Sequence, residues 1–193
     1  KVDGMKITHP QMVQFNCSDW RFIQARLNAC GLMLATNGMG VVSAIKPLAG
    51  APGMNFIPGK PGLRRLQIGR SNAQFTQAIN VGGWNIPTQK ILPGAALPAV
   101  LGLLAYDAKT LKPLNTAAWQ QGYSSLDPGE AVELATARLQ FNHLGAVSGV
   151  LSIEGDASVE PGGSVMLTGF GSASDGTALV TGVTHRFTSR SQG

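Results

Sequence analysis

The side chains best suited to hold a metal ion are three histidines and two cysteines, and they are widely spaced. They are His9, His143, His185, Cys17 and Cys30. No histidine has a second ligand-type residue at the spacing of known zinc motifs, and neither HExxH nor CxxC occurs. His185 lies in a stretch that alternates apolar and polar residues, which is typical of cross-strand packing. The sequence therefore predicts no metal site.

Acidic residues are few, and turns or helix caps explain the two closest pairs. Glu154 and Asp156 flank Gly155 in the arrangement of a possible hydrolase pair, but a strand end followed by a turn explains them as well. Asp127 and Glu130 stand where a helix N-cap and its N3 partner are expected. GxSxG and P-loop motifs are absent, and nothing combines a nucleophile, a base and an oxyanion site. We expect no catalytic residue and no cofactor, so the chain is predicted not to be an enzyme.

The two cysteines bracket one predicted helix, which keeps them apart. Thirteen helical residues separate Cys17 from Cys30 by about 20 Å, whereas a disulfide needs Cα atoms within about 7 Å. Reduced thiols and synthesis in the cytoplasm follow. No signal peptide is evident, and the longest apolar run, Ala95 to Tyr106, is short and interrupted by Pro98 and Gly102. We therefore expect no membrane insertion.

Composition favours a chain of short strands and turns with largely neutral surfaces. Charged residues make up 13% of the chain, about half the usual share, and glycine accounts for 25 residues. The net charge of +5 raises the question of nucleic-acid binding. The 15 basic residues are scattered, however, and the densest groups, around Arg64 and Arg186, have no interleaved aromatics. On this pattern we do not expect nucleic acid as a partner.

The clearest local element is a helix over residues 19–30. Ser18 is a suitable N-cap, and Asp19 suits the positive end of the helix dipole. Trp20, Ile23, Leu27 and Cys30 recur at helical spacing and form one apolar stripe, and a glycine follows at the C′ position. This stripe must dock on another surface.

Two strands and a loop complete the first predicted domain, residues 1–62, an α/β portion that contains the capped helix. Leu32 to Ala35 and Val41 to Ile45 read as strands around an Asn37-Gly38 turn. The segment from Pro47 to Gly62 is rich in proline and glycine, so we interpret it as a loop that ends the domain.

The second predicted domain, residues 63–193, is a β-barrel of the tube type with one helix. Strand patterns cover Phe75 to Trp84 and continue to Leu92, whereas the sequence leaves residues 95–118 undecided between a short helix and a loop. A helix is expected over 128–144, with Leu134, Arg138 and Phe141 on one side and Ala135 and Leu139 beside them.

Three final strands are predicted at Ser148 to Glu154, Ser164 to Thr168 and Ala178 to Phe187. The fold class is mainly β with α (α+β): an antiparallel β-barrel with an attached α/β portion.

The stretch QFNCSDWRFIQARLNACGL resembles a signature of the VgrG and phage late-control protein D family, the hubs of contractile-tail baseplates. In that family a short strand leads into a helix capped by Ser-Asp, and the helix ends at Gly-Leu. The matching positions are Gln14, Phe15, Ser18, Asp19, Trp20, Phe22, Ile23, Arg26, Leu27, Gly31 and Leu32. The strand, helix and turn order of residues 75–187 is similar to the rest of that family's pattern.

The resemblance implies a structural subunit of a trimeric hub or spike in a contractile injection machine. Such a hub adapts a threefold spike to a sixfold tube. Its partners would be two further copies of itself, a spike or OB-fold protein or domain, and the tail-tube protein. It would be made in the bacterial cytoplasm and assembled into a phage tail or a secretion-apparatus baseplate. Whether the machine is a phage tail, a type VI secretion system or a related device stays open, as does whether the chain is a fragment or a reduced relative.

Two other functions fit parts of the sequence. A small basic β-barrel module that binds single-stranded nucleic acid would account for the positive charge. A tail-associated cell-wall hydrolase would need Glu154 and Asp156 as its carboxylates, although the turn already explains them.

Overall fold

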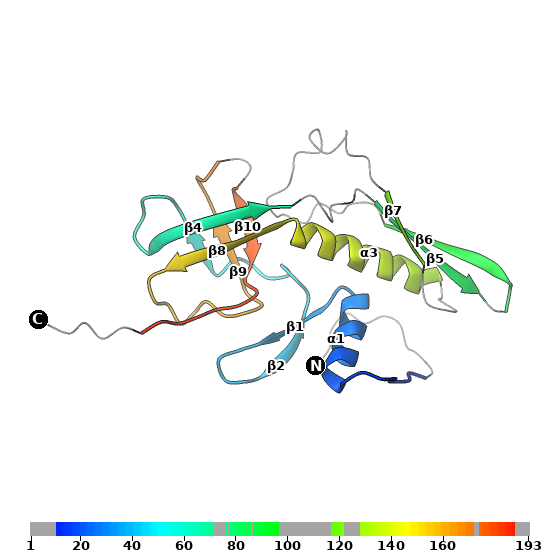
Figure 1. Cartoon of the computed structure of the whole chain (residues 1–193). Coiled ribbons are helices and arrows are strands. Elements are labelled where there is room, and N and C mark those ends of the chain that lie inside the picture. The colour runs from blue at the N-terminus through cyan, green and yellow to red at the C-terminus, as the bar shows by residue number, and fades with distance from the viewer. Residues whose placement is uncertain are drawn as a thin grey trace, which may run out of the picture.

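The structure is a computed structural model of the whole chain, and it describes residues 11–71, 76, 78–85, 87–96, 117–121, 128–171 and 174–187. Two helices and ten strands form the regular structure of these ranges. Figure 1 shows how they are arranged in space. In chain order they are α1 (Asp19–Ala29), β1 (Met33–Thr36), β2 (Val42–Ile45), β3 (Met54–Phe56), β4 (Leu63–Arg70), β5 (Ala78–Asn85), β6 (Lys90–Ala96), β7 (Ala117–Gln121), α3 (Pro128–Gly145), β8 (Val147–Ile153), β9 (Ser164–Leu167) and β10 (Gly176–Leu179).

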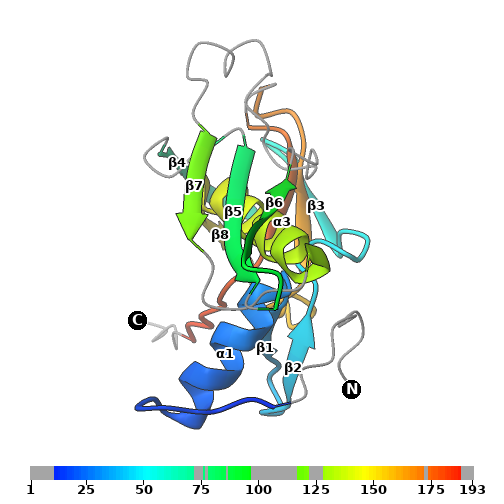
Figure 2. The same cartoon turned by 90° about the vertical axis from the view of Figure 1, so that its right-hand side faces the viewer.

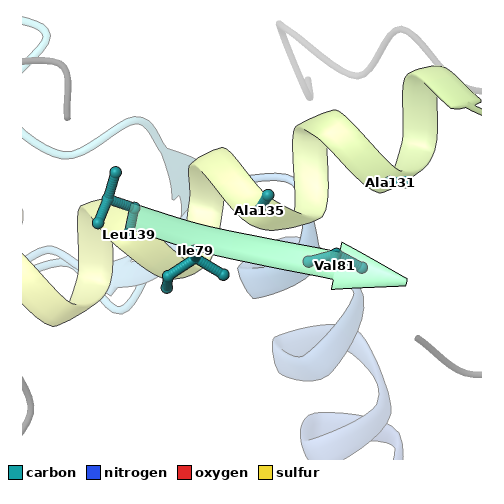
Figure 3. Close-up of a cluster of buried hydrophobic side chains, with 5 residues drawn as sticks. All are labelled: Ile79, Val81, Ala131, Ala135 and Leu139. Carbon is teal, nitrogen blue, oxygen red and sulfur yellow. The ribbon is translucent and has the colours of Figure 1, made fainter. Parts of the chain in front are cut away.

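Helix α3 packs on a three-stranded sheet of order β6-β5-β7 and forms the first core. Ile79 and Val81 alternate along β5 and are both buried, as period-two packing requires. Figure 3 shows them beside Ala135 and Leu139 of α3. Burial of each large side chain stabilises the fold by about 1.5–3 kcal/mol. Alanines on this face of the helix let it approach the sheet closely.

A second core lies between a two-stranded ribbon, β4-β8, and a three-stranded sheet of order β10-β9-β3. Phe56, Val165 and Leu167 are buried in it, and apolar residues of β4 and β8 such as Leu66 and Leu151 pack against them. Strand β8 begins directly after α3, so one continuous segment joins the two cores (Figure 1).

The β1–β2 hairpin is shaped by one asparagine and lies against a glycine turn. The Asn37 side-chain oxygen accepts hydrogen bonds from the backbone N–H groups of Met39 (3.1 Å) and Val41 (2.9 Å). A Cβ on Gly162, in the β8–β9 connection, would lie only 2.7 Å from side-chain carbons of Ala35 and Ile45. This close approach requires glycine.

The α+β class is confirmed, but the strands of the described ranges do not close into one barrel. They form four separate sheets, and two of the pairings, β3 with β9 and β5 with β7, are parallel. The expectation of purely antiparallel pairing was therefore wrong. Residues 97–116, which belong to the segment left undecided, lie outside the described residues.

Two segments differ from their predicted structure. Strand β3 lies inside the proline- and glycine-rich segment that was expected to be a loop, because β9 offers it a distant partner. The last strand was expected to reach Phe187 but ends at Leu179, since β9 is only four residues long and the pairing runs out near Val180. The division at residue 62 stays a prediction, and the β3–β9 pairing crosses it. None of the described helices has the length and apolar character needed to cross a membrane.

Candidate interaction surface

Helix α1 begins where the sequence predicts, because its capping groups are in place. The Ser18 hydroxyl oxygen accepts a hydrogen bond from the backbone N–H of Arg21 at 3.4 Å. The Gln14 side-chain amide donates to the Cys17 carbonyl oxygen and to an Asp19 carboxylate oxygen, both at 2.8 Å. These bonds hold residues 14–18 against the start of the helix.

The end of α1 is a Schellman motif that also serves as a packing contact. The Leu32 N–H donates to the Leu27 carbonyl (2.9 Å), and the Gly31 N–H donates to the Asn28 carbonyl (3.1 Å). Gly31 has φ +73° and is buried. A Cβ at this position would lie 3.3 Å from the Gln140 side-chain oxygen on α3. Gly31 therefore both turns the chain and lets α1 meet α3.

Only the C-terminal half of the predicted apolar stripe is buried. Leu27 is buried and Leu32 follows it into the interior, whereas Trp20 and Ile23 remain 49% and 46% exposed. Figure 2 shows α1 extending beyond the part of the molecule where α3 lies. The stripe thus meets α3 at its Leu27 end, whereas at its other end Trp20 and Ile23 keep about half of their surface accessible.

Further apolar side chains are exposed in the segment that precedes α1. Met12, Val13 and Phe15 are all exposed, and Phe15 keeps 86% of its surface accessible. We call Met12, Val13, Phe15, Trp20 and Ile23 the α1 surface. Large exposed apolar groups gathered in one short segment are typical of an interaction site.

Charged residues surround the junction of the two helices. Burial raises the pKa of the Cys30 thiol, and Glu133 raises it further, whereas Arg26 opposes this shift. The Arg26 guanidinium also lies 6.0 Å from the centre of the Phe22 ring, at the distance of a cation–π contact. Both cysteines are free thiols.

The candidate catalytic and metal-binding residues take part in local structure. Asp156 accepts a hydrogen bond from the Ser158 N–H at 2.8 Å, and bonds from Ser158 lower the pKa of this carboxyl. His143 Nε2 lies 3.0 Å from the Thr76 carbonyl oxygen, and the His185 ring stacks on Phe187 with centroids 6.4 Å apart. Within the described ranges no three His, Cys, Asp or Glu side chains gather as a metal site would require. His9 and Asp127 lie outside these ranges.

The structure therefore divides the eleven motif residues into four groups. Gln14, Ser18 and Asp19 order the helix start, and Leu27, Gly31 and Leu32 anchor its end. Phe15, Trp20 and Ile23 are exposed, and Phe22 and Arg26 contact one another. Sequence reasoning missed the partner surface on α3, where Ala137 and Gln140 are buried. The sequence feature that could have revealed this surface is the series of small residues Ala131, Ala135 and Ala137. Small side chains on α3 let both β5 and the end of α1 approach this helix closely.

Comparison with known proteins gives one family and one fold. A family model described as the Alg8 N-terminal domain matches residues 1–189. No curated protein matches the chain in sequence. Among solved structures, the tail protein from Neisseria meningitidis MC58 superposes with a TM-score of 0.59 at 10% identity, over 86% of this chain and 50% of that one. The 43 kDa tail protein of prophage MuSo2 from Shewanella oneidensis gives 0.57 at 9% identity, over 86% and 48%.

These values establish a shared fold over most of this chain. The chain spans about half the length of each tail protein, so the likeness concerns one part of those molecules.

Proposed function

This chain belongs to the Alg8 N-terminal domain family, and from its fold we propose that it is a structural subunit of a phage tail that acts through the α1 surface. The observation that carries the proposal is the tail-protein fold, which extends over 86% of the chain. The name of this family specifies no activity, so the proposed function rests on the fold.

The α1 surface supports an assembly role because it combines fixed geometry with exposed apolar area. Its helix is capped at both ends and anchored on α3, so Trp20 and Ile23 are presented on a rigid element. Stable interfaces bury about 800 Å² on each partner, with aromatic side chains at their centres. Phe15 and Trp20 would provide such a centre.

The finer proposal is a homotrimeric hub, in which three copies join a threefold spike to a sixfold tube. The other partners would be a spike or OB-fold protein or domain and the tail-tube protein. The assembled hub would be located in a virion tail. In this scheme the low charge and high glycine content suit a subunit whose faces are covered by neighbours.

Light scattering coupled to size exclusion tests the trimer. One chain has a mass of 20.1 kDa, so the expected species at high concentration is about 60 kDa. Phe15→Glu should shift the mass towards 20 kDa, because it places a charge at the centre of the proposed interface.

Phe187→Glu is the matched control, since Phe187 is 94% exposed and lies far from α1 in the sequence. This variant has the same charge change and should leave the trimer intact. A wild-type chain that stays monomeric at every concentration, or a Phe187→Glu effect equal to that of Phe15→Glu, would contradict the proposed use of α1.

A further inference from the structure

Strand β4 has one edge that is open within the described part of the chain. It pairs with β8 along one side, from Arg65↔Ser152 to Arg70↔Val147, and no described strand pairs with its other side. At eight residues, β4 and β5 are the longest strands in the described ranges. An edge without a described strand partner presents N–H and C=O groups that can accept a further strand.

The alternation of the ladder identifies the groups at this edge. The Ser71 N–H donates to the Ala146 carbonyl oxygen at 2.9 Å, one step beyond the Arg70↔Val147 pair. Hydrogen-bonded pairs alternate in an antiparallel ladder, so Gln67 and Gly69 also face β8. The backbone groups of Leu66 and Ile68 consequently point to the open side.

A groove of about 440 Å³ runs along the same strand. Its apolar lining comes from Leu63, Leu66, Ile68 and Phe170, which belong to or pack against the second core. Its far wall is formed by the loops after β3 and after β9, and Arg70 donates a hydrogen bond across to the Ser174 hydroxyl at 3.0 Å. The open edge therefore has beside it one groove that is lined in part by apolar side chains.

The rim of this groove is basic. Arg64 and Arg65 line it, and Lys60 lies in the turn that precedes β4; all three are exposed. None of the three forms an ion pair within the part of the chain that the structure describes. The carboxylate at the neighbouring end of β8, Glu154, is exposed and does not pair with them. This charge favours an acidic ligand and disfavours edge-to-edge pairing with a second copy, which would bring like charges together.

We propose that the β4 edge binds an extended acidic peptide segment of a partner protein as an added strand. The segment pairs with the backbone of Leu66 and Ile68. Its alternate side chains are apolar and enter the groove, and those between them are acidic and face Arg65. This partner is additional to the copies that would meet at the α1 surface, and its binding does not depend on trimer formation.

Fluorescence anisotropy with the full chain tests the proposal. The probe is a labelled eight-residue peptide of alternating valine and glutamate, which matches β4 in length. It should bind, and the Arg64→Glu/Arg65→Glu variant should weaken binding by about ten-fold or more. In hydrogen exchange, the Leu66 and Ile68 amides should become protected when the peptide is bound.

The control variant Arg21→Glu/Arg138→Glu makes the same change in net charge at two exposed positions of α1 and α3. Its affinity should stay within about two-fold of wild type. Circular dichroism checks that both variants are folded.

Three results would overturn the proposal. Equal binding by a peptide N-methylated at alternate residues would rule out strand pairing. Unchanged affinity after replacement of its glutamates by lysine would rule out charge recognition. Tighter binding of an oligothymidylate, with loss of affinity in the Arg64→Glu/Arg65→Glu variant, would assign the groove to nucleic acid.

Discussion

Gly31 meets two requirements at once, a positive φ angle and a close approach to α3. In the Gly31→Ala variant the alanine backbone must keep a positive φ angle, which is unfavourable for a residue with a Cβ. The new methyl group would also lie 3.3 Å from the Gln140 side-chain oxygen. Gly40→Ala is the matched control, because Gly40 has φ +77° but nothing within 4 Å of its Cβ position. We expect Gly40→Ala to lower the free energy of unfolding by about 1 kcal/mol and Gly31→Ala by about twice that. Urea denaturation measures both, and equal losses would show that the contact with α3 contributes nothing.

The Gln140 side chain is expected to destabilise the same α1–α3 junction. It is 8% exposed, and its Nε2 atom is buried with no hydrogen-bond acceptor among the described residues. A buried donor left unpaired costs about 1–3 kcal/mol, so Gln140→Met should keep or raise the free energy of unfolding. A loss of more than about 2 kcal/mol in thermal or urea unfolding would mean that the amide has a stabilising role.

At the scale of elements, the reactivity of the Cys30 thiol reports on the α1–α3 junction. Burial and Glu133 both raise the pKa of this thiol, so at pH 8 less of it is the reactive thiolate. In a Cys17→Ser background, alkylation of Cys30 should be slower in the folded protein than in urea. Glu133→Gln should speed the reaction, and Arg26→Gln should slow it. The same sign for both variants would contradict this electrostatic account.

This pKa shift also sets the direction of a pH effect on stability. A thiol whose folded pKa is raised contributes stability that is fully present below its unfolded pKa. That contribution is lost as the pH rises through the folded value. The free energy of unfolding should therefore decline on the alkaline side, and Cys30→Ser should remove that part of the decline in urea titrations at several pH values.

Elements fixed by local chemistry were predictable from the sequence, and those fixed by distant neighbours were not. Ser18, Gly31 and the Asn37 turn specify α1 and the β1–β2 hairpin within a few residues. Strand β3 was missed because its three residues depend on β9 for their pairing. The inward face of α3 was only partly predicted: Ala135 and Leu139 are buried, but Arg138 is exposed.

The candidate site shows the same division. Helical spacing correctly placed Trp20, Ile23 and Leu27 on one stripe. Spacing cannot state how far the docking surface extends, however, and α3 covers only the Leu27 end. The exposure of Trp20 and Ile23 follows from the positions of both helices in the fold.

At the scale of the whole molecule, composition predicted the many short strands, because glycine-rich chains with few charges favour turns. The order of the predicted helices and strands gave the α+β class. It did not predict four separate sheets. Sheet order depends on which edges meet, and pairings such as β3 with β9 leave no periodic signal in either strand.

The parallel pairing of β3 with β9 has a consequence for the chain as it leaves the ribosome. Asn55 and Thr168, whose side chains are hydrogen-bonded across this pair, are 113 residues apart. At typical rates of translation, roughly ten seconds pass between the synthesis of these two residues. During that interval β9 is absent, so Phe56 lacks its partner strand and the second core cannot close. Late folding of the second core is therefore a property of this topology.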